Sequence, residues 1–581
     1  MIKKLAGCVR QYKLPALITP VLVILETIAE IAIPVVMADL IDKGIYMGDM
    51  QQVVIAGIKL LVLTCLAMAF GVAAGFTASH ASAGFAANLR HDMFENVQKF
   101  SFFSIDRFST ASIVTRLTTD VSNVQMAFQM ITRITFRAPF MLIFAFVFAY
   151  NIDNQLSMVF LYTIPLLAVG LFVIVKFAFP RFQRVFKTYD KLNAVVEENL
   201  RGIRVVKSFV REDFEKEKFG KISDSIYTDF TKAEKTVALN GPLMQLAVYT
   251  CMVLISWFGA QAVVASGNNE VLGLSTGELM SLFTYSMQIL MSLMMISVIF
   301  VMLTMSKASA NRIVEILDEK TDIDDGEKNL TEVKDGSIEF RNVSFRYSEG
   351  AEKNALEKID LTIRSGETIG VLGGTGSSKS TLVQMIPRLY DTTEGEVYVG
   401  GENVRDYNLN ALRNSVAMVL QKNVLFSGTI KDNLRWGDPE ATNEQMKHVC
   451  ELACADEFIQ GFPDKYDTYI EQGGANVSGG QKQRLCIARA LLKKPKILIL
   501  DDSTSAVDTK TDAMIRKAFR EEIPDTTKII IAQRVSSVMD ADRIIVMNNG
   551  AVEAVGTHEE LLENNAIYRE VYESQMKGAE E

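Results

Sequence analysis

The sequence predicts a two-part chain, in which an all-helical membrane domain is followed by a soluble α/β domain. Long apolar runs with little charge dominate up to about Met305, whereas from Lys307 onward charged, glycine and turn residues alternate with short strand-like segments. A glycine-rich loop in the second part lies between a strand-like and a helix-like segment. At 581 residues the chain is too long for one core, which agrees with two or more domains.

Six stretches of the first part are long and apolar enough to cross about 30 Å of hydrocarbon, which takes about 20 residues. They lie near 15–38, 53–80, 134–152, 156–178, 242–265 and 275–303. Lys and Arg concentrate at the N-terminus and in segments 81–133 and 179–241, whereas the opposite loops offer only Lys43. The positive-inside rule therefore predicts a multi-pass protein of the lipid bilayer, with both termini and both long connections in the cytoplasm.

The two long cytoplasmic connections are predicted to be helical. Each is about 50 to 60 residues of helix-forming sequence, and structureless loops of that length are rare. As helical hairpins, with arms of about 25 residues at about 1.5 Å each, they would reach about 35 to 40 Å from the membrane. That length is sufficient to touch a cytosolic domain.

Charge and cysteine content exclude several classes of protein. The net charge is -9, the pI is near 5.4 and no basic stripe is present, so nucleic acid is not an expected partner. The six cysteines are scattered and lack the Cys/His spacing of a metal site. A disulfide framework is not expected either, because cytosolic thiols stay reduced.

The glycine-rich loop of the second part has the pattern of a P-loop. It follows the strand-like segment 368–372 and comprises Gly373, Gly374, Thr375, Gly376, Ser377, Ser378, Lys379, Ser380 and Thr381. In such a loop backbone amides surround phosphate oxygens, Lys379 neutralises the β/γ charge, and the Ser380 hydroxyl binds Mg²⁺. Ser378 replaces the usual glycine, and we expect the loop to tolerate it. Asp501, at the end of the apolar run 497–500, would hold the Mg²⁺ through water.

A second motif precedes Asp501 and narrows the choice among nucleotide-binding proteins. It begins with Val477 and has the form Val-Ser-Gly-Gly-Gln, comprising Val477, Ser478, Gly479, Gly480 and Gln481. With the P-loop, this motif and Asp501 in order, the whole chain resembles the ATP-binding cassette (ABC) family, whose signature is Leu-Ser-Gly-Gly-Gln. It looks like a type I exporter half-transporter (type IV in structural nomenclature), similar to the degenerate-site subunit of bacterial heterodimeric multidrug exporters.

The resemblance implies boundaries and further roles. The expected parts are a transmembrane domain at 1–318, with coupling-helix loops near 110–120 and 202–212, a linker at 319–335, a nucleotide-binding domain at 336–575 and a tail at 576–581. By the same resemblance Tyr347 stacks on adenine, and Gln421 contacts Mg²⁺ together with Ser380 and Asp501. Ser505 and Asp508 belong to the loop that crosses to the partner's site.

Besides Ser378, two catalytic positions on the P-loop face depart from the family pattern. Asp502 stands where the family has the glutamate that orients the attacking water, and an error of about 1 Å in position can cost roughly 10²-fold. Gln533 stands where the family has a histidine that contacts the γ-phosphate. In this family each ATP lies between one chain's P-loop face and the other chain's signature. We therefore expect this face to bind ATP and Mg²⁺ but to be catalytically impaired, while the signature completes a partner's hydrolytic site.

The expected function is that of one subunit of a heterodimeric ATP-driven exporter, which moves hydrophobic or amphipathic compounds out of the cytoplasm or inner leaflet. The resemblance places it in a cell membrane, of the bacterial plasma-membrane type, beside a second half-transporter. Two alternatives stay open. The chain could form a homodimeric exporter of lipid or peptide with slow ATP hydrolysis, or it could be a regulatory subunit that transports nothing.

Charged residues within the predicted spans suggest where cargo binds. Glu26 and Glu30 lie one turn apart in the first span, and Arg133 and Arg137 lie one turn apart near the third. A charge at mid-membrane costs roughly 2.5–3.5 kcal/mol on insertion scales, so these side chains should face the interior. The glutamates could attract cationic amphiphiles, or they could pair with the two arginines.

Overall fold

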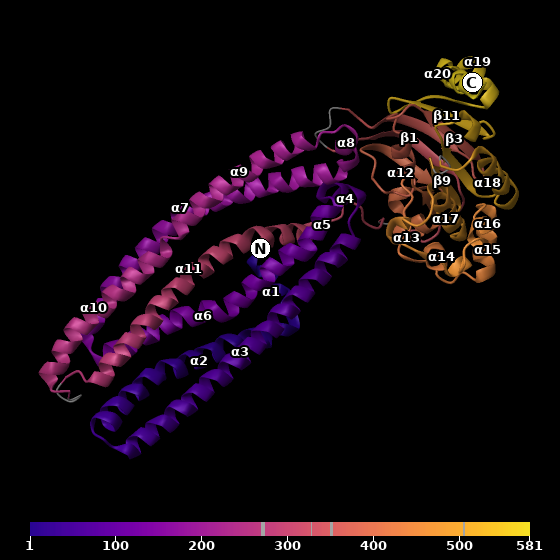
Figure 1. The fold of residues 1–581 in the computed structure, drawn as a ribbon. Helices are drawn as coiled ribbons and strands as arrows, with labels where there is room; N and C mark the ends of the chain where they lie inside the picture. The colour runs from indigo at the N-terminus through magenta and orange to yellow at the C-terminus, as the bar shows by residue number, and fades with distance from the viewer. Residues whose placement is uncertain (269–272, 327, 349–352, 503–505, 581) are drawn as a thin grey trace. The chain divides into compact units, whose positions relative to one another are not determined.

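The chain forms two compact units in a computed structural model, which describes residues 1–268, 273–326, 328–348, 353–502 and 506–580 (Figure 1). The first unit comprises Met1–Gln98 and Ser109–Glu319. The second comprises Lys99–Phe108 and Lys320–Glu581. A ten-residue piece of the first long connection, Lys99–Phe108, therefore belongs to the second unit.

The first unit is entirely helical. Its helices are α1 (Ile2–Gly7), α2 (Lys13–Asp39), α3 (Met50–Gln98), α5 (Thr110–Thr115), α6 (Val121–Ile152), α7 (Asn154–Arg201), α8 (Ile203–Ser208), α9 (Glu212–Val237), α10 (Asn240–Ser266) and α11 (Thr276–Asp318). Within the described residues, six helical stretches are long and apolar enough to span a membrane: Arg10–Tyr46, Met50–Gln98, Thr110–Ile152, Asn154–Phe182, Glu212–Ser266 and Thr276–Ile296. The predicted six-span architecture is confirmed.

Side chains of helix α11 donate hydrogen bonds to backbone carbonyls of helix α2. The buried Tyr285 hydroxyl donates to Ile31 O at 2.9 Å, and Ser281 Oγ donates to Pro34 O at 2.6 Å. Pro34 lies inside α2 and has no backbone N–H to donate. Because hydrocarbon offers no alternative partners, side chains of a neighbouring helix satisfy polar groups near such an interruption.

The second long connection forms the predicted hairpin. Helices α7 and α9 run side by side and are joined through the short helix α8 (Figure 1). The rings of Phe182 and Phe230 meet edge to face at 6.1 Å, and Arg181 donates to Lys232 O at 3.0 Å. The segment 202–212 therefore lies at the tip of a long helical pair.

The first connection turns earlier in the chain than the sequence indicates. Helix α4 (Phe102–Phe108) is the part that groups with the second unit, whereas the segment near 110–120 belongs to the first unit. There Arg116–Asp120 forms a π-helical turn, and the fully buried Asp120 accepts from Arg312 Nε at 2.7 Å. A buried carboxylate needs its ion partner, which fixes this turn inside the helical packing.

The second unit contains a six-stranded sheet with the order β12-β11-β3-β10-β9-β6. Its strands are β3 (Thr368–Gly373), β6 (Val416–Val419), β9 (Ile497–Asp501), β10 (Thr527–Ile531), β11 (Arg543–Asn548) and β12 (Ala551–Gly556). All neighbours are parallel except β12, which pairs antiparallel with β11. Every residue of β9 and β10 is buried, as expected for parallel strands covered on both faces.

Smaller sheets and helices complete the second unit. An antiparallel sheet has the order β2-β1-β4-β5, with β1 (Ile338–Phe345), β2 (Leu356–Ile363), β4 (Glu394–Val399) and β5 (Glu402–Asn403), and β7 (Gly428–Thr429) pairs with β8 (Tyr469–Ile470). The helices are α12 (Lys379–Gln384), α13 (Leu409–Ser415), α14 (Ile430–Leu434), α15 (Asn443–Leu452), α16 (Asp456–Gln460), α17 (Gly479–Leu492), α18 (Thr509–Glu522), α19 (His558–Asn564) and α20 (Ala566–Glu580). The membrane-helical and α/β fold class is confirmed.

The central sheet separates two hydrophobic cores. Leu498 and Leu500 of β9 enter one cluster, while Ile497 and Ile499 enter the other, as the period of two in a strand requires. The carboxyl ends of the parallel strands meet at one edge, where Asp501 is in register with Ile531. This edge carries the P-loop.

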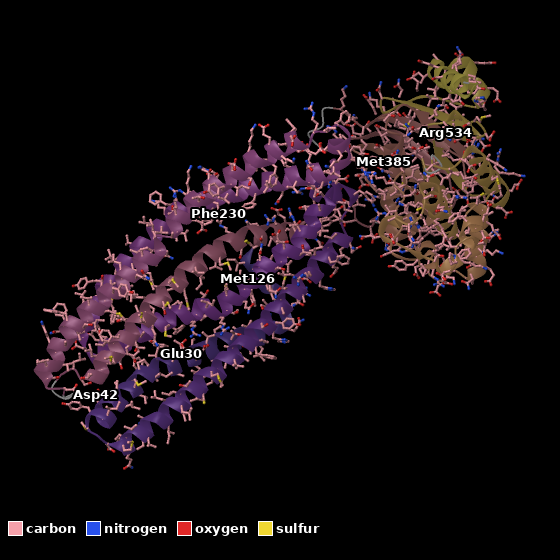
Figure 2. The ribbon with its side chains drawn as sticks, in the orientation of Figure 1. Glu30, Asp42, Met126, Phe230, Met385 and Arg534 are labelled. Carbon is pink, nitrogen blue, oxygen red and sulfur yellow. The ribbon has the colours of Figure 1, made fainter. Side chains whose placement is uncertain are left out.

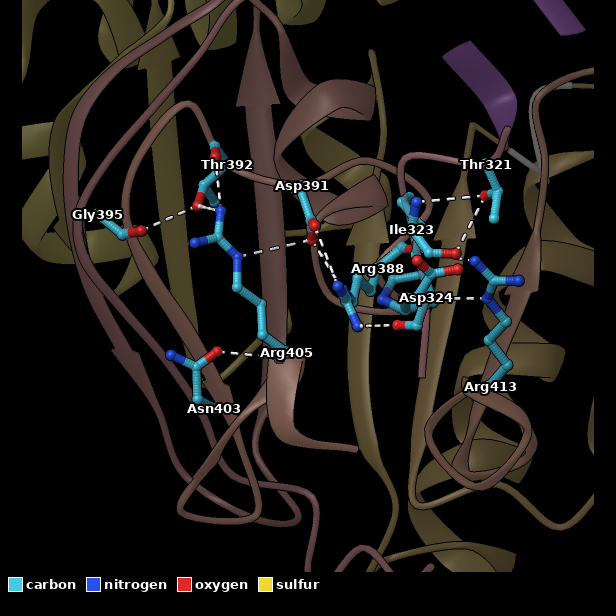
Figure 3. A network of polar contacts seen from close by, with 11 residues as sticks. Thr321, Ile323, Asp324, Arg388, Asp391, Thr392, Gly395, Asn403, Arg405 and Arg413 are labelled. Carbon is cyan, nitrogen blue, oxygen red and sulfur yellow. Dashed lines mark hydrogen bonds and ion pairs between the residues drawn. The ribbon is translucent and has the colours of Figure 1, made fainter. Parts of the chain in front are cut away.

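The segment expected to be a linker packs onto the second unit. Ile323 and Val333 are buried, and the guanidinium of the buried Arg388 donates to Asp324 O at 2.9 Å while pairing with Asp391 at 2.8 Å (Figure 3). Arg405 extends the same network to Thr392 O at 2.8 Å. The few apolar residues of this mostly polar segment are buried or partly buried, so the segment is packed rather than a free linker.

Candidate nucleotide site

Ser380 and Asp501 meet at the carboxyl edge of the sheet, as the P-loop pattern requires. Ser380 Oγ donates to Asp501 Oδ1 at 3.0 Å. Burial raises the pKa of Asp501, and the Ser380 hydrogen bond opposes that rise. A hydroxyl beside a buried carboxylate is a donor set of hard oxygens that fits Mg²⁺.

Lys379 is folded back over the P-loop. Its Nζ donates to Gly373 O and Gly374 O, both at 2.9 Å. Burial lowers the pKa of Lys379, and the carboxylates of Asp501 and Asp502 act in the opposite direction. The ammonium is therefore held at the mouth of the loop, where phosphate oxygens would compete for it with backbone carbonyls.

Ser378 occupies a backbone conformation that favours glycine. Its φ is 69° and its ψ is 26°, which is the left-handed region. A residue with a Cβ costs roughly 1–2 kcal/mol there. Gly376 of the same loop also has a positive φ, of 82°. The loop therefore contains two residues at positive φ, of which only Ser378 has a Cβ.

Asp502 receives two side-chain amides on one oxygen. Gln533 Nε2 donates to Asp502 Oδ2 at 3.0 Å, and Gln421 Nε2 donates to the same oxygen at 3.4 Å. The Asp502 backbone has φ 48°, and its N–H donates to Ile531 O at 3.0 Å. The structure thus brings together three residues that the sequence assigned to separate motifs.

Tyr347 lies in an aromatic cluster beside the P-loop helix. Its hydroxyl forms a hydrogen bond with Thr381 Oγ1 at 2.9 Å, and its exposed fraction is 43%. The ring meets those of Phe345 at 4.9 Å and Tyr390 at 5.4 Å edge to face. The stacking of Tyr347 on adenine stays a prediction.

Sequence reasoning missed Tyr390 and Asp106. The buried Tyr390 hydroxyl donates to Asp106 Oδ2 of α4 at 2.8 Å. Burial raises the pKa of Tyr390, and the carboxylate of Asp106 raises it further. No local pattern signals this pair, because its members are 284 positions apart.

The signature motif begins helix α17. Ser478 Oγ accepts from Gln481 N at 3.3 Å, and Gln481 Oε1 accepts from Ser478 N at 2.9 Å, which forms a capping box. Val477 is buried, whereas Ser478 and Gly479 are exposed. A Cβ at Gly480 would lie 2.9 Å from Ala506 O. The motif therefore begins a capped helix, and Ser478 and Gly479 are accessible there.

Asp508 caps the helix that follows the strand-end carboxylates. Its Oδ1 accepts from Thr511 N at 3.0 Å, and backbone hydrogen bonding lowers its pKa. Ser505 lies outside the described residues. Of the two residues expected in the loop that crosses to a partner, the structure thus places only Asp508.

Comparison with known proteins identifies the family. The family described as ABC transporter transmembrane region matches residues 16–294, and that described as ABC transporter matches residues 356–505. The "Uncharacterized ABC transporter ATP-binding protein YfiB" of Bacillus subtilis (strain 168) is 36% identical over 575 residues, which covers 99% of each chain. The chain belongs to the ABC transporter family.

Other relatives of this ABC transporter agree in length. The "ATP-dependent lipid A-core flippase" of Desulfotalea psychrophila is 33% identical over 495 residues, which covers 84% of each chain. The solved structure of a bacterial Atm1-family ABC exporter with ATP bound matches with a TM-score of 0.81 at 22% identity, covering 97% of this chain and 98% of that one. The ABC transporter chain therefore has the fold of an exporter half-transporter.

The ABC transporter carries an ion triad within its membrane spans. Arg137 Nη1 donates to Glu26 Oε1 at 2.6 Å, and Nη2 donates to Glu30 Oε1 at 2.7 Å; Figure 2 marks Glu30 on α2. Among the residues that the structure describes, no hydrogen bond or ion pair joins Arg133 to either glutamate. A Cβ at Gly71 would lie 2.9 Å from Glu26 Oε1, so glycine leaves room for the carboxylate. Of the two arginines considered, Arg137 alone pairs with both glutamates.

Proposed function

We propose that this chain is one half of a heterodimeric ATP-driven exporter whose own P-loop face retains ATP and hydrolyses it slowly. The observation that carries the proposal is the contact between Asp502 and Gln533. An amide donates and accepts hydrogen bonds but does not exchange a proton as imidazole does. The aspartate is shorter than the glutamate it replaces, and two side-chain amides donate to one of its oxygens.

Residues around the P-loop support ATP binding on this face. Mg²⁺, when bound, would neutralise charge between the β- and γ-phosphates. Ser380 and Asp501 would hold the Mg²⁺ ion. Gln421 is hydrogen-bonded to Asp502, the residue that follows Asp501. Lys379 would exchange its loop carbonyls for phosphate oxygens, and Tyr347 would stack on the base. This face would bind and orient nucleotide, but among the described residues Asp502 is a poorly placed general base for the attacking water.

The signature face supports a partner with a competent site. Ser478 and Gly479 stand exposed at the start of α17, where a helix N-terminus favours a partner's γ-phosphate. The motif departs from the family signature only in having valine for leucine at Val477. The economical arrangement is one impaired face and one productive face in the same dimer.

Two exposed apolar surfaces support docking between half-transporters. Val205, Phe209 and Val210 are all more than half exposed at the tip formed by α8. In the second unit the rings of Phe426 and Trp436 stack at 4.2 Å on the surface. We assign α8 as the coupling helix that docks onto the partner's ATPase domain, and α4 as the first coupling helix in place of the segment near 110–120.

The proposed cargo is a hydrophobic or amphipathic compound taken from the cytoplasm or from the inner leaflet of a bacterial plasma membrane. In this proposal both termini of the chain lie in the cytoplasm. The triad of Glu26, Glu30 and Arg137 has one carboxylate in excess, which favours cationic amphiphiles. Lipid is the second candidate, because one relative is a lipid A-core flippase.

Comparison of the chain alone with the chain in its complex tests the proposal. The partner is to be identified by co-purification of the full-length chain from its own host. We expect the isolated chain in lipid nanodiscs to bind ATP but to hydrolyse it at least about 10-fold more slowly than the complex. Equal hydrolysis by the isolated chain would instead support the homodimeric exporter. ATP hydrolysis by the complex without ATP-driven uptake of any cargo into vesicles would support the regulatory subunit.

A further inference from the structure

The C-terminal helix α20 reaches back to the loop that carries Gln533. Gln575 Oε1 accepts from Val535 N at 2.8 Å, and Gln575 Nε2 donates to Gln533 O at 2.8 Å. Only this orientation of the amide satisfies both contacts, since the reverse would oppose donor to donor and acceptor to acceptor. One side chain therefore binds the backbone on both sides of Arg534.

Helix α20 is itself anchored, so Gln575 has a fixed base. Tyr568 is fully buried, and its hydroxyl forms a hydrogen bond with His558 Nδ1 at 2.7 Å. Tyr568 shares a buried cluster with Val535 and Val538, which directly follow the Gln533 loop. Gln575 lies seven positions after Tyr568, about two helical turns, which places both residues on the same face of α20.

The contact continues from the loop to the nucleotide site. Fixing the carbonyl of Gln533 and the N–H of Val535 sets the position from which the Gln533 side chain extends. That side chain then donates to Asp502 Oδ2 at 3.0 Å. A continuous set of contacts thus joins Gln575, Gln533 and Asp502.

We propose that Gln575 is a positioning residue that holds the Gln533 loop against the nucleotide site and so slows the release of ATP from this face. The inference extends the proposed function, in which this face retains ATP. It assigns to the C-terminal helix control over how long nucleotide stays bound. Gln575 acts through Gln533 and does not itself touch the nucleotide.

The test measures release of a fluorescent, non-hydrolysable ATP analogue from the full-length chain in lipid nanodiscs. Gln575→Leu removes both hydrogen bonds and is expected to speed release roughly 5- to 10-fold. Gln575→Glu keeps the acceptor for Val535 N and should give an intermediate rate. Ser574→Ala, a neighbouring exposed position on the same helix, is the matched control and should leave the rate unchanged.

A double-mutant cycle separates positioning from general stability. If Gln575 acts through Gln533, Gln575→Leu adds nothing to the release rate in a Gln533→Ala background. Additive effects, or a wild-type release rate in both Gln575 variants, would overturn the proposal. Because the analogue is not hydrolysed, these outcomes do not depend on which face is catalytic. The proposed function fails separately, if Asp502→Asn stops ATP hydrolysis by the complex.

Discussion

The side-chain amide of Gln533 donates to Oδ2 of Asp502 at 3.0 Å, so the two positions that depart from the family pattern touch each other. Gln421 donates to the same oxygen. The two departures therefore form one local unit, in which each residue suits the other. Changing one residue alone leaves the other without its matched partner.

Restoring both positions should raise hydrolysis far more than restoring either one. We expect Asp502→Glu or Gln533→His alone to raise the rate less than about 3-fold, and the double variant to raise it at least about 10-fold, because residues in contact do not act additively. The measurement is ATP hydrolysis by the complex with the partner's catalytic glutamate changed to glutamine, so that only this face contributes. A full rise from one substitution would show that the positions act independently.

Replacing Ser378 with glycine should stabilise the second unit. The left-handed backbone costs a residue with a Cβ roughly 1–2 kcal/mol, and glycine's greater loss of chain freedom returns part of that gain, leaving about 0.5–1 kcal/mol. Thermal unfolding of the full-length protein measures the change. Ser378→Ala keeps the Cβ and is the control. An equal gain from alanine would assign the effect to the hydroxyl and contradict the backbone explanation.

Removing the Tyr390 hydroxyl should loosen helix α4. Tyr390→Phe keeps the ring packing but deletes the donor to Asp106, and a hydrogen bond to a charged group contributes about 1.5–3 kcal/mol. We expect a lower thermal midpoint for Tyr390→Phe. Asp106→Asn keeps an acceptor and should have a smaller effect. A larger loss from asparagine than from phenylalanine would mean that the hydroxyl is not the important group.

Arg137 and Arg133 should differ sharply despite their similar positions. Arg137→Leu leaves two carboxylates unpaired within the membrane spans, and breaking a buried pair typically costs about 3–5 kcal/mol. Arg133→Leu breaks no ion pair to either glutamate and should cost much less. Thermal unfolding of both variants in detergent compares them. Similar losses would show that the triad is not the main determinant.

The sequence was sufficient to predict features that depend on residues close together in the chain. The six spans, the P-loop and Asp501 are continuous patterns, and Ser380 meets Asp501 because parallel strands end at one edge. The sequence could not show which of Arg133 and Arg137 pairs with the glutamates, because the two arginines lie only one turn apart. The packing of their helix against α2 decides this. The contacts of Gln575 were also missed, since they join the C-terminal helix to a loop 40 positions earlier.

The first long connection between membrane spans also could not be placed from the sequence. Its residues are helical except at 99–101 and 109, and its composition does not mark these breaks. The buried ion pair of Asp120 with Arg312, which spans 192 positions, fixes one segment in the first unit. The contact of Asp106 with Tyr390 fixes another in the second. Long-range pairing rather than local propensity sets this turn.

ATP hydrolysis by the purified complex, with each face disabled in turn, tests the central claim most directly. Asp502→Asn disables this chain's face, and glutamine for the partner's catalytic glutamate disables the other. Our account predicts that Asp502→Asn leaves most of the activity, while the partner substitution removes nearly all of it. Loss of activity with Asp502→Asn would contradict the account and make this P-loop face a working catalytic site.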